Sequence, residues 1–302
     1  MHDGSTILLT GATGFLGKTM LKQLGNKHHV ITLGRGKTNL IQCDLRNKVP
    51  SLGQMDIVIH AAGKAHVVPK NSLEAEEFFE VNVTGLSNLL AALDPANSLQ
   101  KFVFISSVAV YGLTEGNLVS ENFPLQAEDP YGKSKIAAEK IVSDWCIKNE
   151  IKYYILRLPL IAGTNAPGNL GALARGIKND RYFSIGKASA KKSLVLAEDI
   201  ARFITIMDGP SGIYHLTDGY HPTFSELETK ISSFYGKKNV PSIPISIAKI
   251  FGSIGDLIGM DFFPLNSKKL KKITSNLTFD DSKARNHLNW HSNAVLKHWE
   301  IE

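Results

Sequence analysis

The chain has 302 residues, of which 43% are hydrophobic and 21% are charged. This length suits one large globular domain or two joined ones, and the composition excludes a disordered or low-complexity chain. The formal net charge of +6 indicates anionic partners. However, the basic residues are spread along the chain, apart from a short run at Lys268–Lys272, so we expect no nucleic-acid partner.

The sequence also predicts the compartment. Two cysteines, Cys43 and Cys146, provide neither a disulfide framework nor a metal-ligand cluster. The chain begins without a basic and apolar leader, so we expect no signal peptide and a cytoplasmic location. The apolar stretch 243–263 is interrupted by three charged residues, so we expect neither a membrane span nor a membrane partner.

The first half of the chain alternates strand-like and helix-like segments. Strands are predicted at 6–10, 30–33, 57–60, 102–106 and 153–157, and helices at 17–24, 75–93 and 133–149. The strand segments are continuous apolar runs, which are typical of strands covered on both faces. The repeat predicts right-handed βαβ crossovers and therefore an α/β fold with a doubly wound parallel sheet of the Rossmann type.

From about residue 159 the pattern changes. Loops rich in Gly, Asn and Pro at 162–171 are followed by short helices, a strand near 212–216 and a basic, polar end. We predict a Rossmann domain over residues 1–165, to which the chain returns at about 193–217. Residues 166–302 are predicted to form mainly a smaller substrate-binding domain, with the substrate cleft at the carboxyl ends of the strands.

A glycine-rich loop lies between the first strand and the first helix. It reads Gly11-Ala12-Thr13-Gly14-Phe15-Leu16-Gly17. Small residues allow the turn to close, the backbone to approach a pyrophosphate and the helix to pack on the strand. The helix N-terminus would then offer N–H groups and a positive dipole end to the phosphates. This position in a βαβ unit predicts a dinucleotide site over Gly11–Gly17.

The end of the second predicted strand bears on the choice between NAD and NADP. Sites for NAD place an acidic residue there to accept from the ribose hydroxyls, whereas arginine accommodates the 2′-phosphate of NADP. Here the sequence is Leu33-Gly34-Arg35-Gly36-Lys37. Arg35 therefore favours NADP(H) as cofactor, with NAD(H) kept as the alternative.

A tyrosine and a lysine open the third predicted helix. Tyr131 and Lys135 are four residues apart and project from one helical face. A free tyrosine has a pKa of about 10 and is a poor base at neutral pH. A neighbouring ammonium group, together with the positive charge of an oxidised nicotinamide, is expected to stabilise the phenolate and lower that pKa. Ser106 and Ser107 place hydroxyl groups at the carboxyl end of the strand at 102–106, and a serine there can hydrogen-bond the substrate oxygen that Tyr131 would protonate or deprotonate.

With these motifs in this order, the sequence resembles the extended short-chain dehydrogenase/reductases, the NAD-dependent epimerase/dehydratase group acting on nucleotide sugars. The resemblance covers nearly the whole chain. It implies that Ser107, Tyr131 and Lys135 are catalytic, that Tyr131 and Lys135 also contact the cofactor, and that the protein forms a homodimer through its two long helices. Further cofactor contacts are implied for Asp44, Leu45, Ala61, Ala62, Gly63, Asn82 and Pro159.

In the second half, the resemblance implies that Asn169 contacts the diphosphate of a nucleotide sugar. The segments 196–200 and 280–284 resemble two late signatures of the family. Lys192 stands where sugar-nucleotide epimerases have an arginine, and is predicted to contact the substrate. Lysine neutralises a phosphate but cannot form the two parallel hydrogen bonds that arginine forms with it. The sequence therefore defines the substrate less narrowly than it defines the cofactor.

The resemblance also narrows the chemistry. Family members that dehydrate sugars have an Asp-Glu pair directly after the catalytic hydroxyl residue, whereas this chain has Val108 and Ala109. We therefore expect oxidation or reduction at one carbon, with no metal site. The segment 63–67 and Arg35 favour a reductase of UDP-4-keto-6-deoxy-HexNAc sugars. A UDP-sugar 4-epimerase and a non-catalytic NADP sensor remain alternatives.

Two residues are left with two interpretations each. His66 follows the Ala61–Gly63 segment and is either a sugar-pocket residue or a solvated one. Tyr111, four residues after Ser107, is either a pocket wall or core.

Overall fold

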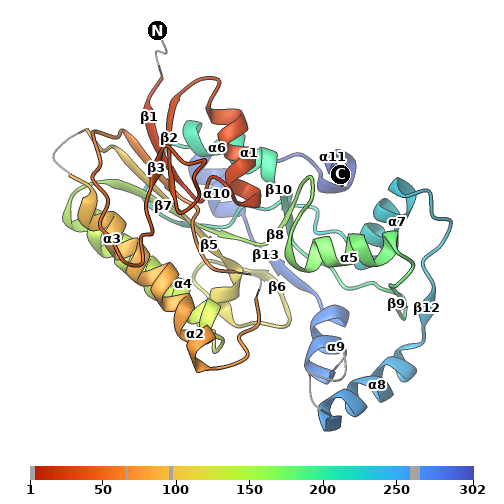
Figure 1. Ribbon diagram of the computed structural model, residues 1–302. Coiled ribbons are helices and arrows are strands. Elements are labelled where there is room, and N and C mark those ends of the chain that lie inside the picture. Colours follow the sequence, from red (N-terminus) through yellow and green to blue (C-terminus); the bar gives the residue numbers. More distant parts are fainter. Residues whose placement is uncertain (1–3, 66, 95–97, 259–265) are drawn as a thin grey trace.

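The computed structural model describes residues 4–65, 67–94, 98–258 and 266–302. Its centre is a seven-stranded parallel sheet with the strand order β11-β7-β5-β4-β1-β2-β3 (Figure 1). The strands are β1 (Thr6–Thr10), β2 (His29–Gly34), β3 (Ile41–Gln42), β4 (Ile57–His60), β5 (Lys101–Ser107), β7 (Lys152–Leu158) and β11 (Gly212–Tyr214). The predicted Rossmann fold is confirmed.

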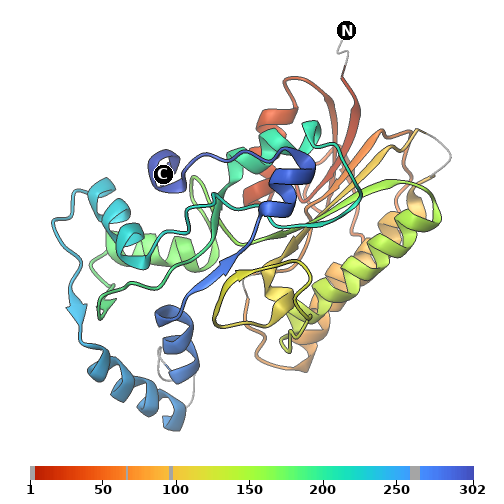
Figure 2. The same cartoon turned by 180° about the vertical axis from the view of Figure 1, so that it is seen from behind.

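Helices cover both faces of this sheet, which explains why its strands are apolar without alternation (Figures 1 and 2). On one face, α1 (Phe15–Leu24), α6 (Ala197–Ile206) and α10 (Ser282–Leu288) contribute to the core. On the other, α3 (Gly85–Ala92) and α4 (Pro130–Lys148) do so. Cys146 is fully buried in the second core.

The helix predicted at 75–93 consists of three segments. These are α2 (Ser72–Phe79), a π-helical turn (Glu80–Thr84) and α3. Single π-helical turns are rare and are frequent at functional sites. Here the turn contains Asn82, whose side chain is 1% exposed and points into the protein.

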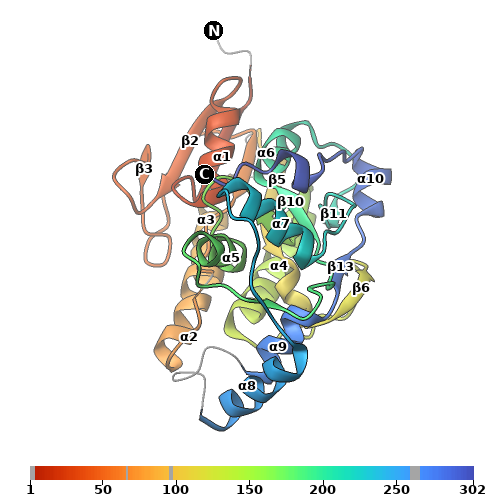
Figure 3. The same ribbon diagram turned by 90° about the vertical axis from the view of Figure 1, so that its right-hand side faces the viewer.

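The remaining elements form a second lobe beside the carboxyl edge of the sheet (Figures 1 and 3). Its helices are α5 (Gly168–Lys178), α7 (Phe224–Phe234), α8 (Ile245–Ile258), α9 (Ser267–Thr274) and α11 (Val295–His298). Outside the central sheet, the described residues form three short pairs of parallel strands. They are β8 (Leu160–Ala162) with β10 (Leu194–Leu196), β9 (Ser184–Ile185) with β12 (Ser242–Ile243), and β6 (Gly116–Val119) with β13 (Leu277–Phe279). The sequence did not reveal these two- to four-residue strands, because they are too short for periodicity.

The chain crosses back to the sheet within its second half. Helix α6 packs against α1, and β11 pairs with β7 as the edge strand of the sheet.

Candidate active site

The glycine-rich loop has the backbone that its sequence requires. Gly11 has a φ of +74°, and a Cβ there would lie 2.6 Å from the backbone nitrogen of Ala62. A side chain at Gly17 would collide with the carbonyl of Gly11. Gly14 is the N-cap of α1 and has no side chain to cap it. The N-terminus of α1 can therefore be approached closely by a phosphate, as a dinucleotide requires.

A second loop, Ala61–Gly63, is held beside the first. The Thr10 hydroxyl accepts from the backbone N–H of Ala62 at 3.2 Å and lies 2.9 Å from Nδ1 of His60. His60 is 1% exposed and stacks on Phe104. Burial, reinforced by the charge of Lys135, lowers the pKa of His60 to about 3, so this imidazole is neutral.

Asn82 joins this second loop to the helix that carries Tyr131. Its Oδ1 accepts from the backbone N–H of Lys64 at 2.7 Å, and its Nδ2 donates to the Ser134 hydroxyl at 2.9 Å. The Ser134 hydroxyl in turn donates to the carbonyl of Tyr131 at 2.7 Å. Asn82 thus fixes the spacing between the predicted cofactor loop and the predicted catalytic residues.

The structure brings the three predicted catalytic residues together. Ser107 is the last residue of β5 and Tyr131 lies in the first turn of α4, close enough for the Ser107 side chain to influence the pKa of the Tyr131 hydroxyl. One turn further along α4, Nζ of Lys135 donates to the carbonyl of Ile105 at 2.8 Å. A Cβ on Gly63 would lie 3.4 Å from that Nζ, so the lysine adjoins the cofactor loop.

The electrostatics of Tyr131 differ from the sequence-based expectation. Burial raises its pKa, and the hydrogen bond with Ser107 opposes that increase only in part. Burial also lowers the pKa of Lys135 to about 8, against the opposing charge of Glu139. In the protein alone, desolvation of the phenolate is the largest influence on the Tyr131 pKa, and Lys135 is not among the groups that shift it. The lower pKa expected with an oxidised nicotinamide beside Tyr131 and Lys135 stays a prediction.

The ribose end of the predicted site is rich in arginine. Arg35 and Lys37 are exposed after β2. Asp44 follows β3, and its carboxylate pairs with Arg46 at 2.7 Å. The hydrogen bond from Arg46 is the main reason that the pKa of Asp44 lies below its usual value. Leu45 is half-buried and packs against the core beneath α3.

A buried polar network behind the catalytic residues was missed from the sequence. Glu139 and Arg157 are 4% and 2% exposed, and they form an ion pair at 2.7 Å. Arg157 also donates to the Tyr111 hydroxyl at 2.9 Å, and that hydroxyl lies 2.7 Å from Nε2 of His215. Tyr111 is therefore core. The sequence did offer one signal for this network, because Arg157 is a charged residue near the end of a largely apolar strand.

The two predicted substrate residues of the second lobe lie in different environments. Asn169 is exposed as the second residue of α5. Lys192 is 6% exposed, and its Nζ donates to the carbonyls of Lys272 and Ser275, both at 2.8 Å. Burial lowers the Lys192 pKa to about 8. This ammonium holds the end of α9, so its contact with substrate stays a prediction.

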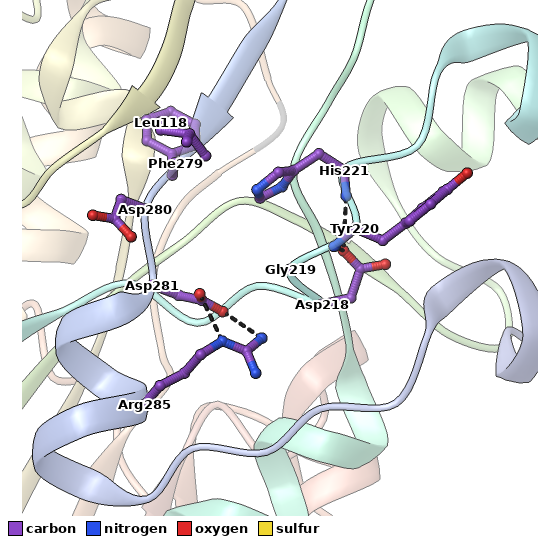
Figure 4. A pocket seen from close by; sticks show the side chains of 9 residues that line it. All are labelled: Leu118, Asp218, Gly219, Tyr220, His221, Phe279, Asp280, Asp281 and Arg285. Atoms are coloured by element: carbon purple, nitrogen blue, oxygen red, sulfur yellow. Dashed lines mark hydrogen bonds and ion pairs between the residues drawn. The ribbon is translucent and has the colours of Figure 1, made fainter.

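The two late signatures have structural partners. Asp199 is fully buried and accepts from the backbone N–H and the side-chain amide of Asn293. Asp281 pairs with Arg285 at 2.9 Å and accepts from the Thr217 hydroxyl (Figure 4). These aspartates hold the C-terminal segment against the rest of the protein.

A hollow of about 490 Å³ opens beside Asp281 and Arg285 (Figure 4). It is lined by Leu118, Asp218, Gly219, Tyr220, His221, Phe279, Asp280, Asp281 and Arg285. None of the predicted catalytic residues is among them, so this hollow is not the catalytic site. His66 lies outside the described residues, and Pro159 lies between β7 and β8.

Comparison with known proteins adds the family. The model of the NAD dependent epimerase/dehydratase family matches residues 7–210. The chain belongs to this family. The protein is therefore an enzyme of the epimerase/dehydratase family, as its resemblance implied.

Two curated relatives of this epimerase/dehydratase protein match along most of their length. One is an N-acetyl-alpha-D-glucosaminyl-diphospho-ditrans,octacis-undecaprenol 4-epimerase of Escherichia coli O157:H7, 28% identical over 94% of this chain and 89% of that protein. Another is a UDP-glucose 4-epimerase of Vibrio cholerae, 28% identical over 94% and 90%. Among solved structures, RMD from Pseudomonas aeruginosa complexed with NADPH shares the fold, with a TM-score of 0.73 and 18% identity over 97% and 96% of the two chains.

Proposed function

We propose that this protein reduces the C4 keto group of a UDP-4-keto-6-deoxy-HexNAc-type sugar with NADPH, in the cytoplasm. The proton-transfer part rests on the hydroxyl groups of Ser107 and Tyr131, which meet beside Lys135 at the carboxyl edge of the sheet. The choice of reduction over epimerisation rests on Arg35. An arginine at this position favours NADP(H), and a reductase must exchange its cofactor in each cycle.

The residues around the glycine loop fit a nicotinamide dinucleotide. Gly11 and Gly17 leave no room for side chains, and Gly14 leaves the start of α1 uncapped for the pyrophosphate. Asp44 and Leu45 would hold the adenine end, and Ala61–Gly63 the part nearer Tyr131. Such a cofactor would supply or accept the hydride.

The protein's own residues handle the oxygen and its proton. During reduction, the Ser107 hydroxyl donates to the C4 oxygen and positions it, and the Tyr131 hydroxyl gives that oxygen its proton as the carbon gains hydride. Tyr131 is protonated at neutral pH and so can act as the acid in the direction of reduction, while the burial that raises its pKa makes it a weaker acid in the protein alone. Val108 and Ala109 follow Ser107 in a 3₁₀ turn and have no group for the proton transfers of dehydration.

A second candidate is a 4-epimerase, because both curated relatives described above have that activity. Epimerisation needs the same Ser107 and Tyr131, but retains its cofactor through the cycle. The relatives also differ in the group that carries the sugar, a nucleoside diphosphate in one and a polyprenyl diphosphate in the other. Both carriers present a sugar diphosphate, for which Asn169 is our proposed contact.

We also propose the domain division at residues 1–165 and 166–302, with a return at 193–217, and a homodimer through α2–α3 and α4. The separate core under α5 and α7 supports the division.

Three mixtures distinguish the reactions. The first contains UDP-4-keto-6-deoxy-GlcNAc and NADPH, and the second UDP-GlcNAc or UDP-glucose without reductant. The third contains N-acetylglucosaminyl-diphospho-undecaprenol without reductant. A reductase oxidises NADPH in the first mixture and forms one 4-hydroxy sugar. Interconversion of 4-epimers in the second or third, with no NADPH oxidation in the first, establishes an epimerase and overturns the proposal.

A further inference from the structure

Helix α8 packs through small residues. Within residues 245–256, the part of α8 whose burial is described, the buried positions are Ala248, Gly252 and Gly255, and α9 is the helix against which α8 packs. A Cβ on Gly252 would lie 3.4 Å from the backbone nitrogen of Ser267, at the start of α9. Residues without bulk let the two helices approach closely, so the large side chains of α8 are left on its other faces.

Those large side chains form an apolar stripe. Ile247, Ile250, Phe251 and Ile254 follow the i, i+3, i+4, i+7 spacing of one helical face. Ile250 is 60% exposed and Ile247 is 42% exposed. The polar residues Lys249, Ser253 and Asp256 occupy a third side, away from both the stripe and the glycines. An apolar face of this regularity, turned away from the core, is unusual for a helix that serves only the fold.

The neighbouring helix is strongly basic. Of the eight residues of α9, four are exposed lysines, namely Lys268, Lys269, Lys271 and Lys272, while Leu270 is buried. Lys271 pairs with Glu115 at 2.9 Å. Both helices lie at the same end of the molecule, remote from the sheet (Figures 1 and 3). An apolar helical stripe next to a lysine-rich helix is the chemistry of an element that lies in the headgroup region of an anionic membrane.

We propose that the outer face of α8, together with the lysines of α9, docks on an anionic phospholipid bilayer. The described part of the chain has no helix long and apolar enough to cross a membrane, so the contact is with the surface. This inference departs from the sequence-based expectation that the protein has no membrane partner. This inference does not depend on the reaction proposed above. If the substrate were a sugar linked to a membrane lipid, the contact would bring the enzyme to its substrate.

Cosedimentation with vesicles tests the proposal. The full-length protein is mixed with vesicles of phosphatidylcholine alone or with 30–40% phosphatidylglycerol (roughly the anionic content at which such electrostatic binding is strong), at low and high salt. We expect binding to the anionic vesicles that weakens with salt. The double variant Ile247→Ser/Ile250→Ser should lower the affinity for anionic vesicles at least about tenfold, because it removes apolar area from the contact. The double variant Lys268→Glu/Lys272→Glu should lower the affinity by roughly fivefold or more for each lysine replaced.

Matched variants control for the loss of exposed apolar surface and for the change of charge. Leu40→Ser/Ile206→Ser removes side chains that are 70% and 71% exposed on other faces. Lys22→Glu/Lys297→Glu makes the same charge change at exposed positions elsewhere, and both variants should bind as the parent does. Ile250→Trp provides a second measurement that does not require loss of binding. Its emission should shift to the blue and be quenched by brominated lipid, whereas Ile206→Trp should show neither effect.

Three results would overturn the proposal. The parent protein could ignore anionic vesicles, or the α8 variant could bind them as well as the parent does. Alternatively, light scattering could find that Ile247→Ser/Ile250→Ser dissociates an oligomer that has no affinity for vesicles, which would make the stripe an interface between copies of the chain.

Discussion

The carboxyl edge of the sheet and the C-terminal lobe each contain a buried lysine with a pKa lowered to about 8. Lys135 donates to the carbonyl of Ile105 and lies next to Gly63 and Tyr131. Lys192 donates to two carbonyls at the end of α9. Similar burial and a similar pKa thus accompany different proposed roles, catalysis for Lys135 and support of α9 for Lys192. The partners of an ammonium group, more than its pKa, indicate whether it serves a reaction or the fold.

The largest effect is expected for Tyr131→Phe, which tests the proposed role of Tyr131 as proton donor. Without the phenolic hydroxyl the C4 oxygen has no proton donor, so we expect turnover to fall roughly 10²–10⁴-fold. Binding of NADPH, followed by fluorescence, should change little. Near-normal turnover by the phenylalanine variant would show that the proton comes from another group.

A second test addresses the network that joins the two regions. Glu139→Gln removes the charge that balances Arg157 in a buried site, and Arg157 reaches the lobe through Tyr111 and His215. We expect the free energy of unfolding to fall by about 3–5 kcal/mol, measured by denaturant unfolding.

The exposed pair Lys140–Asp144 provides the control for that measurement. Asp144→Asn should cost less than about 1 kcal/mol, because surface ion pairs contribute little. Equal losses in the two variants would mean that the buried pair does not stabilise the protein more than an exposed one.

The two regions also differ in how far the sequence predicted them. The Gly11–Gly17 loop and the Tyr131–Lys135 pair were predictable, because each is determined within a few residues by backbone sterics or helical spacing. The ammonium partners of Lys192 come from residues 80 and 83 positions away. No local pattern encodes such a contact, and the same holds for the ion pair between Glu139 and Arg157. The desolvation that raises the Tyr131 pKa in the protein alone was not predictable either, since burial depends on the whole fold.

Arg35→Asp, directly after β2, tests whether the protein prefers NADPH to NADH. The new carboxylate would repel a 2′-phosphate and accept from a free ribose hydroxyl, so affinity for NADPH should fall by on the order of tenfold or more and affinity for NADH should rise. Isothermal titration with both cofactors measures this. Lys37→Asp, two residues away, is the matched control and should change the ratio less. An unchanged ratio in Arg35→Asp would leave Arg35 as a solvated residue.

The smallest expected effect concerns Lys192 and the pH dependence of stability. The pKa of Lys192 is about 8 in the folded protein and near 10.5 when the chain is unfolded. Between these values the unfolded state binds one more proton than the folded state, so this lysine adds stability as the pH rises. The advantage of the parent protein over Lys192→Met, measured by denaturant unfolding, should therefore grow from pH 8 to 10 by about 1 kcal/mol or more. If Lys192 serves the fold, the variant should also keep its KM for the sugar substrate. A flat difference in stability together with a KM raised about tenfold or more would instead place the ammonium on the substrate diphosphate, and would remove the contrast between the two lysines.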